Sequence, residues 1–401
     1  MKKIWVALLA LAVVATLLMA ACEGTAEETT TTPTEGPTTT LGPITEGSTI
    51  GVCLPALDNP LMLALKDMFV NSFGATYDVQ VSSADGNPNT QASQVENYTA
   101  AGAKFVFVMA VEPTSLLPKL EAAREAGVFV MTVGAEPGDS GRDVIMKMDQ
   151  FLAGAYCALM AKNWVEATYP GAAEASIETG VLVDSTNTEA VQRSNGLLMI
   201  SEPFLQDWEG AYLDAEGNPI SDKDGNYLDG KTEADRVENP VYCAAVNIVQ
   251  TPTAQMSQAG QAAMENILTT NPDVKLVLAY ASDGGAGASQ AIMDEIAKGA
   301  GSVIADLSKV AVFGVGMFGP EGDLVKAASR GEGALRGVIA FGGPDLVGKT
   351  AGIVAKILKG EAVGVDGVIW DELALAVGVD GELVMTPMQA SGALSATPAT
   401  P

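Results

Sequence analysis

Short apolar segments alternate with longer amphipathic segments from Thr49 onward. Near-continuous apolar segments between helical patterns predict parallel strands that are covered on both faces. Asn59-Pro60 predicts a helix start, because Asn can cap the helix and Pro fits its first turn. In this first half we expect strands at Thr49–Leu54, Asp78–Ser83, Phe105–Ala110, Val128–Val133 and Val144–Met148, separated by helices that end near Phe73 or span Asn89–Ala101 and Leu116–Ala126.

The same alternation starts again after Asp149. Two successive units of this kind predict an α/β fold of two doubly wound parallel-sheet lobes with a cleft between them. The second set of strands is expected near Ile177–Val183, Tyr242–Val249, Leu276–Ala279, Val310–Val315 and Leu335–Ala340. Its helices are expected near Phe151–Trp164, Thr188–Ile200, Thr253–Thr270, Gly287–Lys298, Gly319–Arg330 and Asp345–Leu358.

A polar, turn-rich insertion at about 201–240 interrupts the second unit. Gly217 and Gly225 each follow an acidic residue between short β-prone pieces, which predicts a surface hairpin. The order Asp222, Asp224, Asn226 resembles the start of a calcium loop, but Gly225 stands at the fourth place instead of the sixth. We therefore expect no metal site here.

The N-terminal segment has the features of an export signal. Lys2 and Lys3 precede the uncharged apolar run Ile4–Ala21, which ends in Ala20-Ala21-Cys22. This end resembles a lipoprotein signal, which implies cleavage before Cys22 and lipid attachment to that residue. A transmembrane anchor and an ordinary signal peptide are the alternatives. We expect residues 1–22 to be the signal with its lipobox, and the mature protein to be extracytoplasmic and anchored to the cell membrane by lipid.

Two low-complexity segments flank the predicted fold. Residues 23–47 hold ten Thr and five Glu without a basic residue, and this composition predicts a solvated, disordered linker. The Thr- and Pro-containing end, 393–401, is expected to be disordered as well.

Charge and composition exclude several functions. The chain has 22 basic and 49 acidic residues and a formal charge of −27, so nucleic acid is not an expected partner. It has no histidine, which excludes histidine-based triads and histidine-bound zinc. We predict no enzyme activity, cofactor or metal. Cys53, Cys157 and Cys243 lie in apolar stretches without CxxC spacing, which favours buried free thiols over one disulfide plus an unpaired cysteine.

Several sequence segments, in collinear order, resemble those of a known family. They include IGVCLPALDNPLMLALKDMF around the first strand, NPDVKLVLAYASDGGAGASQAI, VAVFGVGMFGPEGDLVKAASRGE and GVIAFGGPDLVGKTAGIVAKILKGE. From about Thr49 to Trp370 the chain resembles the type I periplasmic binding proteins, the ribose- and galactose-type sugar receptors of ABC importers. The resemblance implies a substrate-binding lipoprotein, expected to be a monomer, that captures a small molecule and delivers it to ABC permease subunits.

The resemblance also implies three passages of the chain between the lobes. They fall near Asp149-Gln150, Phe341-Gly342-Gly343 and Gly367–Asp371. Residues 48–149 and 343–369 are thereby assigned to lobe I, and residues 150–342 and 370–392 to lobe II. Such passages form a hinge about which two lobes can close.

Ligands of open parallel sheets bind beyond the carboxyl ends of the strands. Residues at those ends are therefore candidates for ligand binding: Asp58, Asn59, Glu112, Asp184, Arg193, Tyr280, Ser282, Asp283, Phe318 and Phe341. Other roles are open for some of them, namely helix capping for Asp58 and Asn59, a turn for Asp184 and core packing for Tyr280. The resemblance places half of the set at sugar contacts: Asn59, Glu112, Ser282, Asp283 and Phe341.

The usual sugar clamp of the family is largely missing. Leu61 and Met62 stand where two aromatic residues often follow the Asn-Pro pair, and Gly134-Ala135 replace an Asp-Arg pair. Phe341 occupies the position of a glutamine. The strand ends carry many carboxylates and one candidate arginine, Arg193, which favours a neutral polyol or a cationic amine over an anionic ligand.

A sugar or polyol is the favoured ligand, and other readings remain open. One is a receptor of the same fold for a nucleoside, an amino acid or a polyamine. Others are a sensory receptor subunit and an adhesive surface lipoprotein. The segment Gly314-Val-Gly316-Met-Phe-Gly319 matches the dinucleotide fingerprint, but no strand that ends in an acidic residue follows at the required distance.

Overall fold

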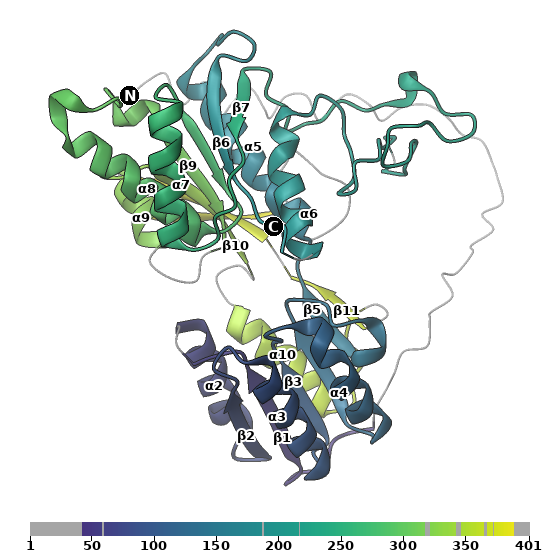
Figure 1. The fold of residues 1–401 in the computed structure, drawn as a ribbon. Coiled ribbons are helices and arrows are strands. Elements are labelled where there is room, and N and C mark those ends of the chain that lie inside the picture. The colour runs from purple at the N-terminus through teal and green to yellow at the C-terminus, as the bar shows by residue number, and fades with distance from the viewer. Residues whose placement is uncertain are drawn as a thin grey trace, which may run out of the picture. The chain divides into compact units, whose positions relative to one another are not determined.

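The computed structural model describes residues 42–57, 60–186, 188–215, 217–316, 321–341, 346–364, 367–371 and 373–388. Their strands form two sheets, each covered by helices (Figure 1). The first sheet contains β1 (Thr49–Leu54), β2 (Asp78–Ser83), β3 (Phe105–Val108), β4 (Phe129–Val133), β5 (Val144–Lys147) and β11 (Val368–Trp370). Its order is β11-β5-β4-β3-β1-β2, and its pairs are parallel.

Helices on the two faces of this sheet enclose two hydrophobic cores. The helices are α2 (Pro60–Phe73), α3 (Pro88–Ala100), α4 (Pro113–Glu125) and α10 (Leu346–Leu358). Phe69 of α2 packs against Phe107 of β3 with 4.8 Å between ring centroids, and Val354 of α10 joins the same buried cluster. On the opposite face, Val95 of α3 and Leu116 of α4 are buried together.

The second sheet contains β6 (Ile177–Leu182), β7 (Val246–Gln250), β8 (Leu276–Ala279), β9 (Ala311–Val315), β10 (Leu335–Phe341), β12 (Leu373–Val379) and β13 (Glu382–Met388). β12 and β13 are antiparallel additions beside β10, whereas the other pairs are parallel. Its helices are α5 (Gln150–Thr168), α6 (Thr188–Leu198), α7 (Ser257–Thr270), α8 (Ser282–Ala297) and α9 (Glu321–Ser329). Tyr156 of α5 and Leu197 of α6 are buried on one face, and Met264 of α7 and Ile292 of α8 on the other.

Both units are wound in the same way. The order β2-β1-β3-β4-β5 in the first sheet matches β7-β6-β8-β9-β10 in the second. The order reverses beside β1 and beside β6, and such switch points leave a crevice for a ligand. The chain passes between the sheets after β5, after β10 and after β11. The predicted α/β class of two doubly wound units is confirmed.

Two helix starts in the second unit differ from the predicted ones by four or five residues. α8 begins at Ser282 rather than near Gly287, and α7 begins at Ser257 rather than at Thr253. The Gly-rich start of α8 has poor intrinsic helix propensity. It permits close packing, because a Cβ at Gly287 would lie 1.8 Å from the carbonyl oxygen of Ser257. Close contact between α7 and α8 therefore overrides the local glycine signal.

The insertion between α6 and β7 is a series of tight turns instead of the single expected hairpin. The backbone amides of Leu213, Ile220 and Leu228 each donate to the carbonyl eight residues earlier, so successive turns stack along the chain. Isolated antiparallel bridges close the turns, joining Gln206 with Tyr212, Leu213 with Pro219 and Ser221 with Tyr227.

Acidic side chains favour turns over a hairpin in this segment. The Asp222 carboxylate accepts hydrogen bonds from the amides of Asp224 and Asn226, each 2.9 Å long. The hydrogen bond from the Asn226 side chain, together with these two amide bonds, holds the pKa of Asp222 below its usual range. Side-chain bonds of this type compete with strand pairing. The carboxylate is thus part of the turn itself.

The end of the predicted linker belongs to the fold. Ile44 is buried in the core beside α2 and α10, and its amide donates to the carbonyl of Leu358 over 2.9 Å. The predicted linker, 23–47, therefore extends too far, because its one well-placed isoleucine contributes apolar surface to the core.

The three cysteines of the fold were predicted to be buried free thiols. Cys53, Cys157 and Cys243 are free and buried, as predicted. Burial raises the pKa of Cys53 to about 12, so this thiol stays protonated.

None of the helices in the described ranges combines the length and the apolar character needed to span a membrane. The apolar leader and Cys22 lie outside those ranges.

Candidate ligand-binding site

A cavity of about 870 Å³ lies at the carboxyl ends of the strands, where doubly wound sheets bind ligands. From the first unit it is lined by the segments that follow β3, β4 and β5, and by Trp370 of β11. From the second unit it is lined by the first residues of α5 and by α6. Trp208 of the insertion completes the lining. The site therefore draws on both doubly wound units.

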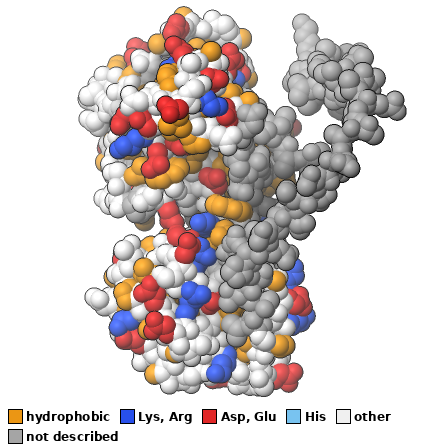
Figure 2. Space-filling model, turned by 90° about the vertical axis from the view of Figure 1, so that its right-hand side faces the viewer, with side chains coloured by type: hydrophobic (Ala, Val, Ile, Leu, Met, Phe, Trp, Pro, Cys, Tyr) orange, Lys and Arg blue, Asp and Glu red, His pale blue; other side chains and the backbone are white. Residues whose placement is uncertain are grey.

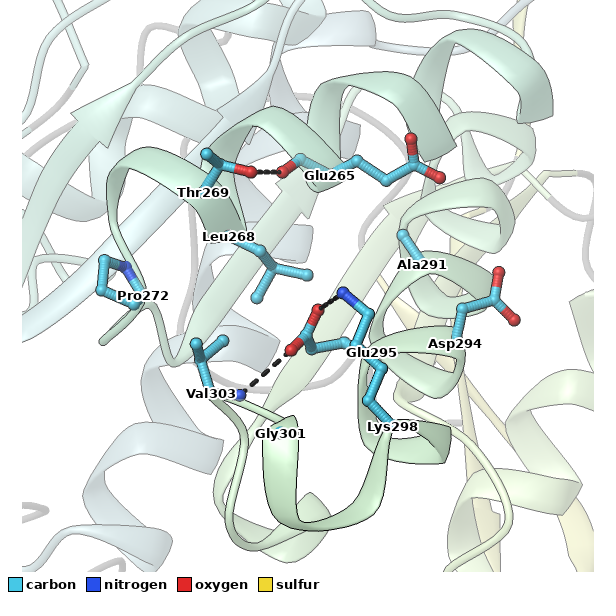
Figure 3. A pocket seen from close by; sticks show the side chains of 10 residues that line it. All are labelled: Glu265, Leu268, Thr269, Pro272, Ala291, Asp294, Glu295, Lys298, Gly301 and Val303. Carbon is cyan, nitrogen blue, oxygen red and sulfur yellow. Dashed lines mark hydrogen bonds and ion pairs between the residues drawn. The ribbon is translucent and has the colours of Figure 1, made fainter.

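A second cavity, of about 610 Å³, lies between α7 and α8 (Figure 3). Its residues precede β8 and β9 in the chain, so it is at the amino ends of these strands. The Glu295 carboxylate in its wall already accepts from Lys298 and from the amide of Val303. Because ligands of this fold class bind at the opposite edge, the cavity of 870 Å³ is the better candidate.

Two carboxylates in the candidate site cap helices. Glu112 precedes α4 and accepts from the amides of Thr114 and Ser115, at 3.1 and 2.7 Å. The bonds from Ser115, together with those from Thr114, hold the pKa of Glu112 below its usual value. Asp149 caps α5 by accepting from the amide of Leu152 at 2.8 Å. Burial nevertheless raises the pKa of Asp149.

An ion-pair cluster forms another part of the wall. Glu136 accepts from Nε and Nη2 of Arg142, at 2.7 and 3.2 Å, and from Lys147 at 3.1 Å. Burial raises the pKa of Glu136, but the bonds and charges of Arg142 and Lys147 outweigh that effect and hold it below its usual value. The amide of Glu136 also donates to Oε1 of Glu189 at 2.9 Å, which joins this loop to α6.

Aromatic and amide side chains complete the lining of the cavity. Phe151, Trp208 and Trp370 contribute rings, and Gln150 and Gln192 contribute amides. Lys147 lies over the ring of Trp370, with 5.2 Å from Nζ to the centroid. The cavity thus combines apolar faces with groups that both donate and accept hydrogen bonds, as small-molecule sites do.

Arg193, Tyr280 and Phe341 come together beside Gln150 of this lining. The Arg193 guanidinium lies between two rings, 4.6 Å from the centroid of Tyr280 and 5.1 Å from that of Phe341. Its Nε and Nη2 donate to Oε1 of Gln150 at 2.8 and 2.6 Å, and Nη1 donates to the carbonyl of Tyr280 at 3.2 Å. Burial lowers the pKa of Arg193, against the raising effect of Tyr280 and nearby carboxylates. In this arrangement Arg193 positions Gln150 in the cavity wall.

The other predicted residues occupy different surroundings. Asp184 is 1% exposed, and it accepts from the amide of Thr186 at 3.1 Å, from its hydroxyl at 3.0 Å and from Gln255. It shapes the loop that brings Thr186 to the cavity. Ser282 and Asp283 form the start of α8, where Ser282 is buried and Asp283 is exposed. Asp58, Asn59 and Phe318 lie outside the described residues.

Sequence reasoning missed most of the cavity wall. Glu112 is the predicted residue that lines it, whereas Glu136, Lys147, Gln150, Glu189, Trp208 and Trp370 were not proposed as ligand contacts. One signal was present in the sequence. Trp208 and Trp370 are two of only four tryptophans, and they stand in the polar insertion and at a passage between the lobes.

Charged side chains of both signs are mixed on one face of the molecule. On the face drawn in Figure 2, Lys and Arg are scattered among Asp and Glu. The basic side chains of that face are thus not gathered into the patch that nucleic-acid binding requires.

The chain matches a protein family and a set of solved structures. The periplasmic binding protein domain family matches residues 50–362, which is more than half of the chain. The ribose ABC transporter protein of Conexibacter woesei shares 14% identity at a TM-score of 0.59, over 84% of this chain and 93% of that one. A solute-binding protein of Actinobacillus succinogenes shares 15% identity at a TM-score of 0.57, over 83% and 99%. A solute-binding protein of Bacillus halodurans shares 18% at a TM-score of 0.54, over 79% and 90%.

No curated protein matches the chain. The structural likenesses, at 14 to 18% identity, establish the fold, and the match over residues 50–362 establishes the family. The resemblance inferred from the sequence segments is thereby confirmed. This chain belongs to the periplasmic binding protein family, whose members are extracytoplasmic solute-binding components of transport and not enzymes.

Proposed function

We propose that the chain captures a neutral sugar or polyol in the cavity at the strand ends and delivers it to the permease of an ABC importer. The observation that carries this proposal is the lining, which combines three aromatic rings with amides and carboxylates. Sugars present hydroxyl groups around C–H faces, so they match hydrogen-bonding groups interspersed with apolar rings.

The carboxylates of the site favour a neutral ligand over a cationic amine. Glu112 accepts from two backbone amides, Asp149 from one, and Glu189 from the amide of Glu136. Glu136 is paired with Arg142 and Lys147. A polyamine gains most from carboxylates that lack a partner. A hydroxyl needs only one remaining lone pair, which Asp149 and Glu189 retain.

The solved relatives support the same class of ligand. One of them is a ribose transporter protein, one was crystallised with D-allose and one with myo-inositol. These ligands share a ring with several hydroxyl groups and no charge. We extend this class to the present chain because its cavity offers the matching groups.

A thermal-shift screen tests the proposal. Neutral ring sugars, inositols and linear polyols are added in separate arms, beside nucleosides, amino acids and polyamines. A ligand at 100 times its Kd stabilises the folded state by about 2.7 kcal/mol, which corresponds to a rise in Tm of roughly 5 °C. We expect such a rise in the sugar or polyol arm. A rise confined to the nucleoside, amino-acid or polyamine arm would replace the proposed ligand class.

Delivery would use closure of the two units around the ligand. Support comes from the three passages between the sheets and from a lining shared by both units. A ligand that contacts both units favours the closed state, since it binds that state more tightly. The permease would then recognise the closed form. A sensory partner is the alternative reader of the same change.

We further propose that the protein is a monomer attached to the membrane through lipid on Cys22. The apolar leader that ends in Ala20-Ala21-Cys22 supports this attachment. We expect Cys22→Ala to abolish incorporation of radiolabelled fatty acid and to move the protein out of the membrane fraction if it is still processed. Cys53→Ala is the matched control, because Cys53 is buried in the fold and should leave labelling unchanged. Label retained by Cys22→Ala would contradict the assignment.

A further inference from the structure

The insertion between α6 and β7 carries one of the aromatic rings of the cavity, Trp208. The tight turn that presents it is built by Asp207, whose Oδ1 accepts from the amides of Glu209 and Ala211, each at 2.9 Å. The side-chain amide of Asn195 on α6 donates to the carbonyl of Trp208 at 2.8 Å. Asp207 thus fixes the turn around Trp208, and Asn195 bonds the Trp208 backbone to α6, a helix that also lines the cavity.

The rest of the insertion is fixed by a separate aromatic cluster. The Arg236 guanidinium lies 4.9 Å from the ring centroid of Phe204, 4.3 Å from that of Tyr212 and 5.4 Å from that of Tyr227. Cation–π contacts of this kind stabilise a segment that has no regular strands. Every aromatic side chain of the insertion (201–240) except Trp208 therefore contacts Arg236.

Trp208 does not take part in that cluster. Within the described ranges, no aromatic or cation contact involves its ring. The side chain is partly exposed and lines the cavity. A large ring held on a fixed turn loses little conformational entropy when a ligand packs against it.

We propose that the insertion is the specificity-determining segment of the site, and that the Trp208 ring packs against the C–H face of a ring sugar or an inositol. The negative face of an aromatic ring attracts the slightly positive C–H groups of such a ligand. Trp208 would supply the aromatic surface that is missing after Asn59-Pro60, where this chain has Leu61 and Met62. The inference rests on the proposed function and adds the residue that selects among neutral ligands.

The experiment compares ring-shaped and linear ligands. Affinities of the full mature chain for a panel of ring sugars, inositols and linear polyols are measured by calorimetry for the wild type, Trp208→Ala, Trp208→Phe and Leu228→Ala. Leu228 is the matched control, because it is an exposed hydrophobic residue of the same insertion and does not line the cavity.

We expect Trp208→Ala to weaken the best ring ligand about 30-fold, as buried tryptophan contacts do. Trp208→Phe should stay within about fivefold of the wild type, and Leu228→Ala within about twofold. A linear polyol has no flat C–H face and should lose less than fivefold. The ratio of ring to linear affinity is the readout that a merely structural role would not change.

The two hypotheses fail in different ways. If the wild type binds no sugar or polyol, the proposed function falls and the role of Trp208 falls with it. If the wild type binds a ring sugar and Trp208→Ala binds it equally well, only the role of Trp208 is overturned. Should Trp208→Ala fail to fold, acrylamide quenching of the wild type decides. Saturating ring ligand should shield tryptophan fluorescence, and unchanged quenching would reject the contact.

Discussion

Gly154→Ala is expected to lower the free energy of unfolding by about 3 kcal/mol, at the upper end of the usual cost of overpacking, although alanine is the better helix former. Gly154 lies within α5, where a Cβ would approach the carbonyl oxygen of Arg193 on α6 to 2.1 Å. The obstructing atom is backbone, so the clash can be relieved only by moving one helix away from the other. Gly196 on α6 has the reciprocal contact, 2.1 Å from the carbonyl of Phe151.

Gly352→Ala provides the matched control. Gly352 lies in the interior of α10, and among the described residues no heavy atom beyond its chain neighbours and its own helix backbone lies within 4 Å of the place its Cβ would take. This variant should be unchanged or more stable by up to about 1 kcal/mol. Both variants are measured by urea unfolding followed by circular dichroism. A Gly154→Ala protein as stable as Gly352→Ala would show that the two helices do not touch through their backbones.

Alternation of apolar and amphipathic segments was sufficient to predict the fold. Strands buried on both faces read as apolar runs, and the limits of β1 (Thr49–Leu54) match the prediction. The limits of β2 (Asp78–Ser83) match as well, although β2 is a partly exposed edge strand. The start of α8 was missed because its glycines indicate a loop locally, whereas their small size serves contact with α7. The start of α8 is set by its packing against α7, and a local sequence pattern carries no information about that packing.

The candidate site was harder to predict for a related reason. The rule that ligands bind at the carboxyl ends of strands pointed to the edge of the sheets where this cavity lies, and it named Glu112, which lines the cavity. It did not separate residues that line this cavity from neighbours that contact the lining, such as Arg193. It also did not include the insertion, because the sequence of a turn-rich segment does not show which part of the fold that segment packs against. The position of Trp208 depends on the hydrogen bond that its carbonyl accepts from Asn195 of α6, and a sequence pattern does not show this contact.

Replacing Arg193 by methionine is expected to reduce ligand affinity about tenfold or more and to lower the free energy of unfolding by about 3 kcal/mol. Methionine can fill the space between Tyr280 and Phe341, but it cannot donate to Gln150. The side-chain oxygen Oε1 of Gln150 would lose the two hydrogen bonds from the guanidinium, while Gln150 is only 8% exposed and has little access to water. Since Gln150 lines the cavity, its side chain should then reorient and disturb the site.

Two further variants separate positioning from stability. Arg193→Lys keeps the charge but loses the planar fork, so it should restore stability more fully than affinity. Arg330→Met removes an exposed arginine whose Nε donates to Glu332 at 2.9 Å, and it should cost less than about 1 kcal/mol without affecting affinity. Calorimetric titration at a temperature where all the variants are folded gives the comparison. If Arg193→Met bound the ligand as tightly as Arg330→Met, Gln150 would not need its arginine, and the cluster of Tyr280, Arg193 and Phe341 would serve stability alone.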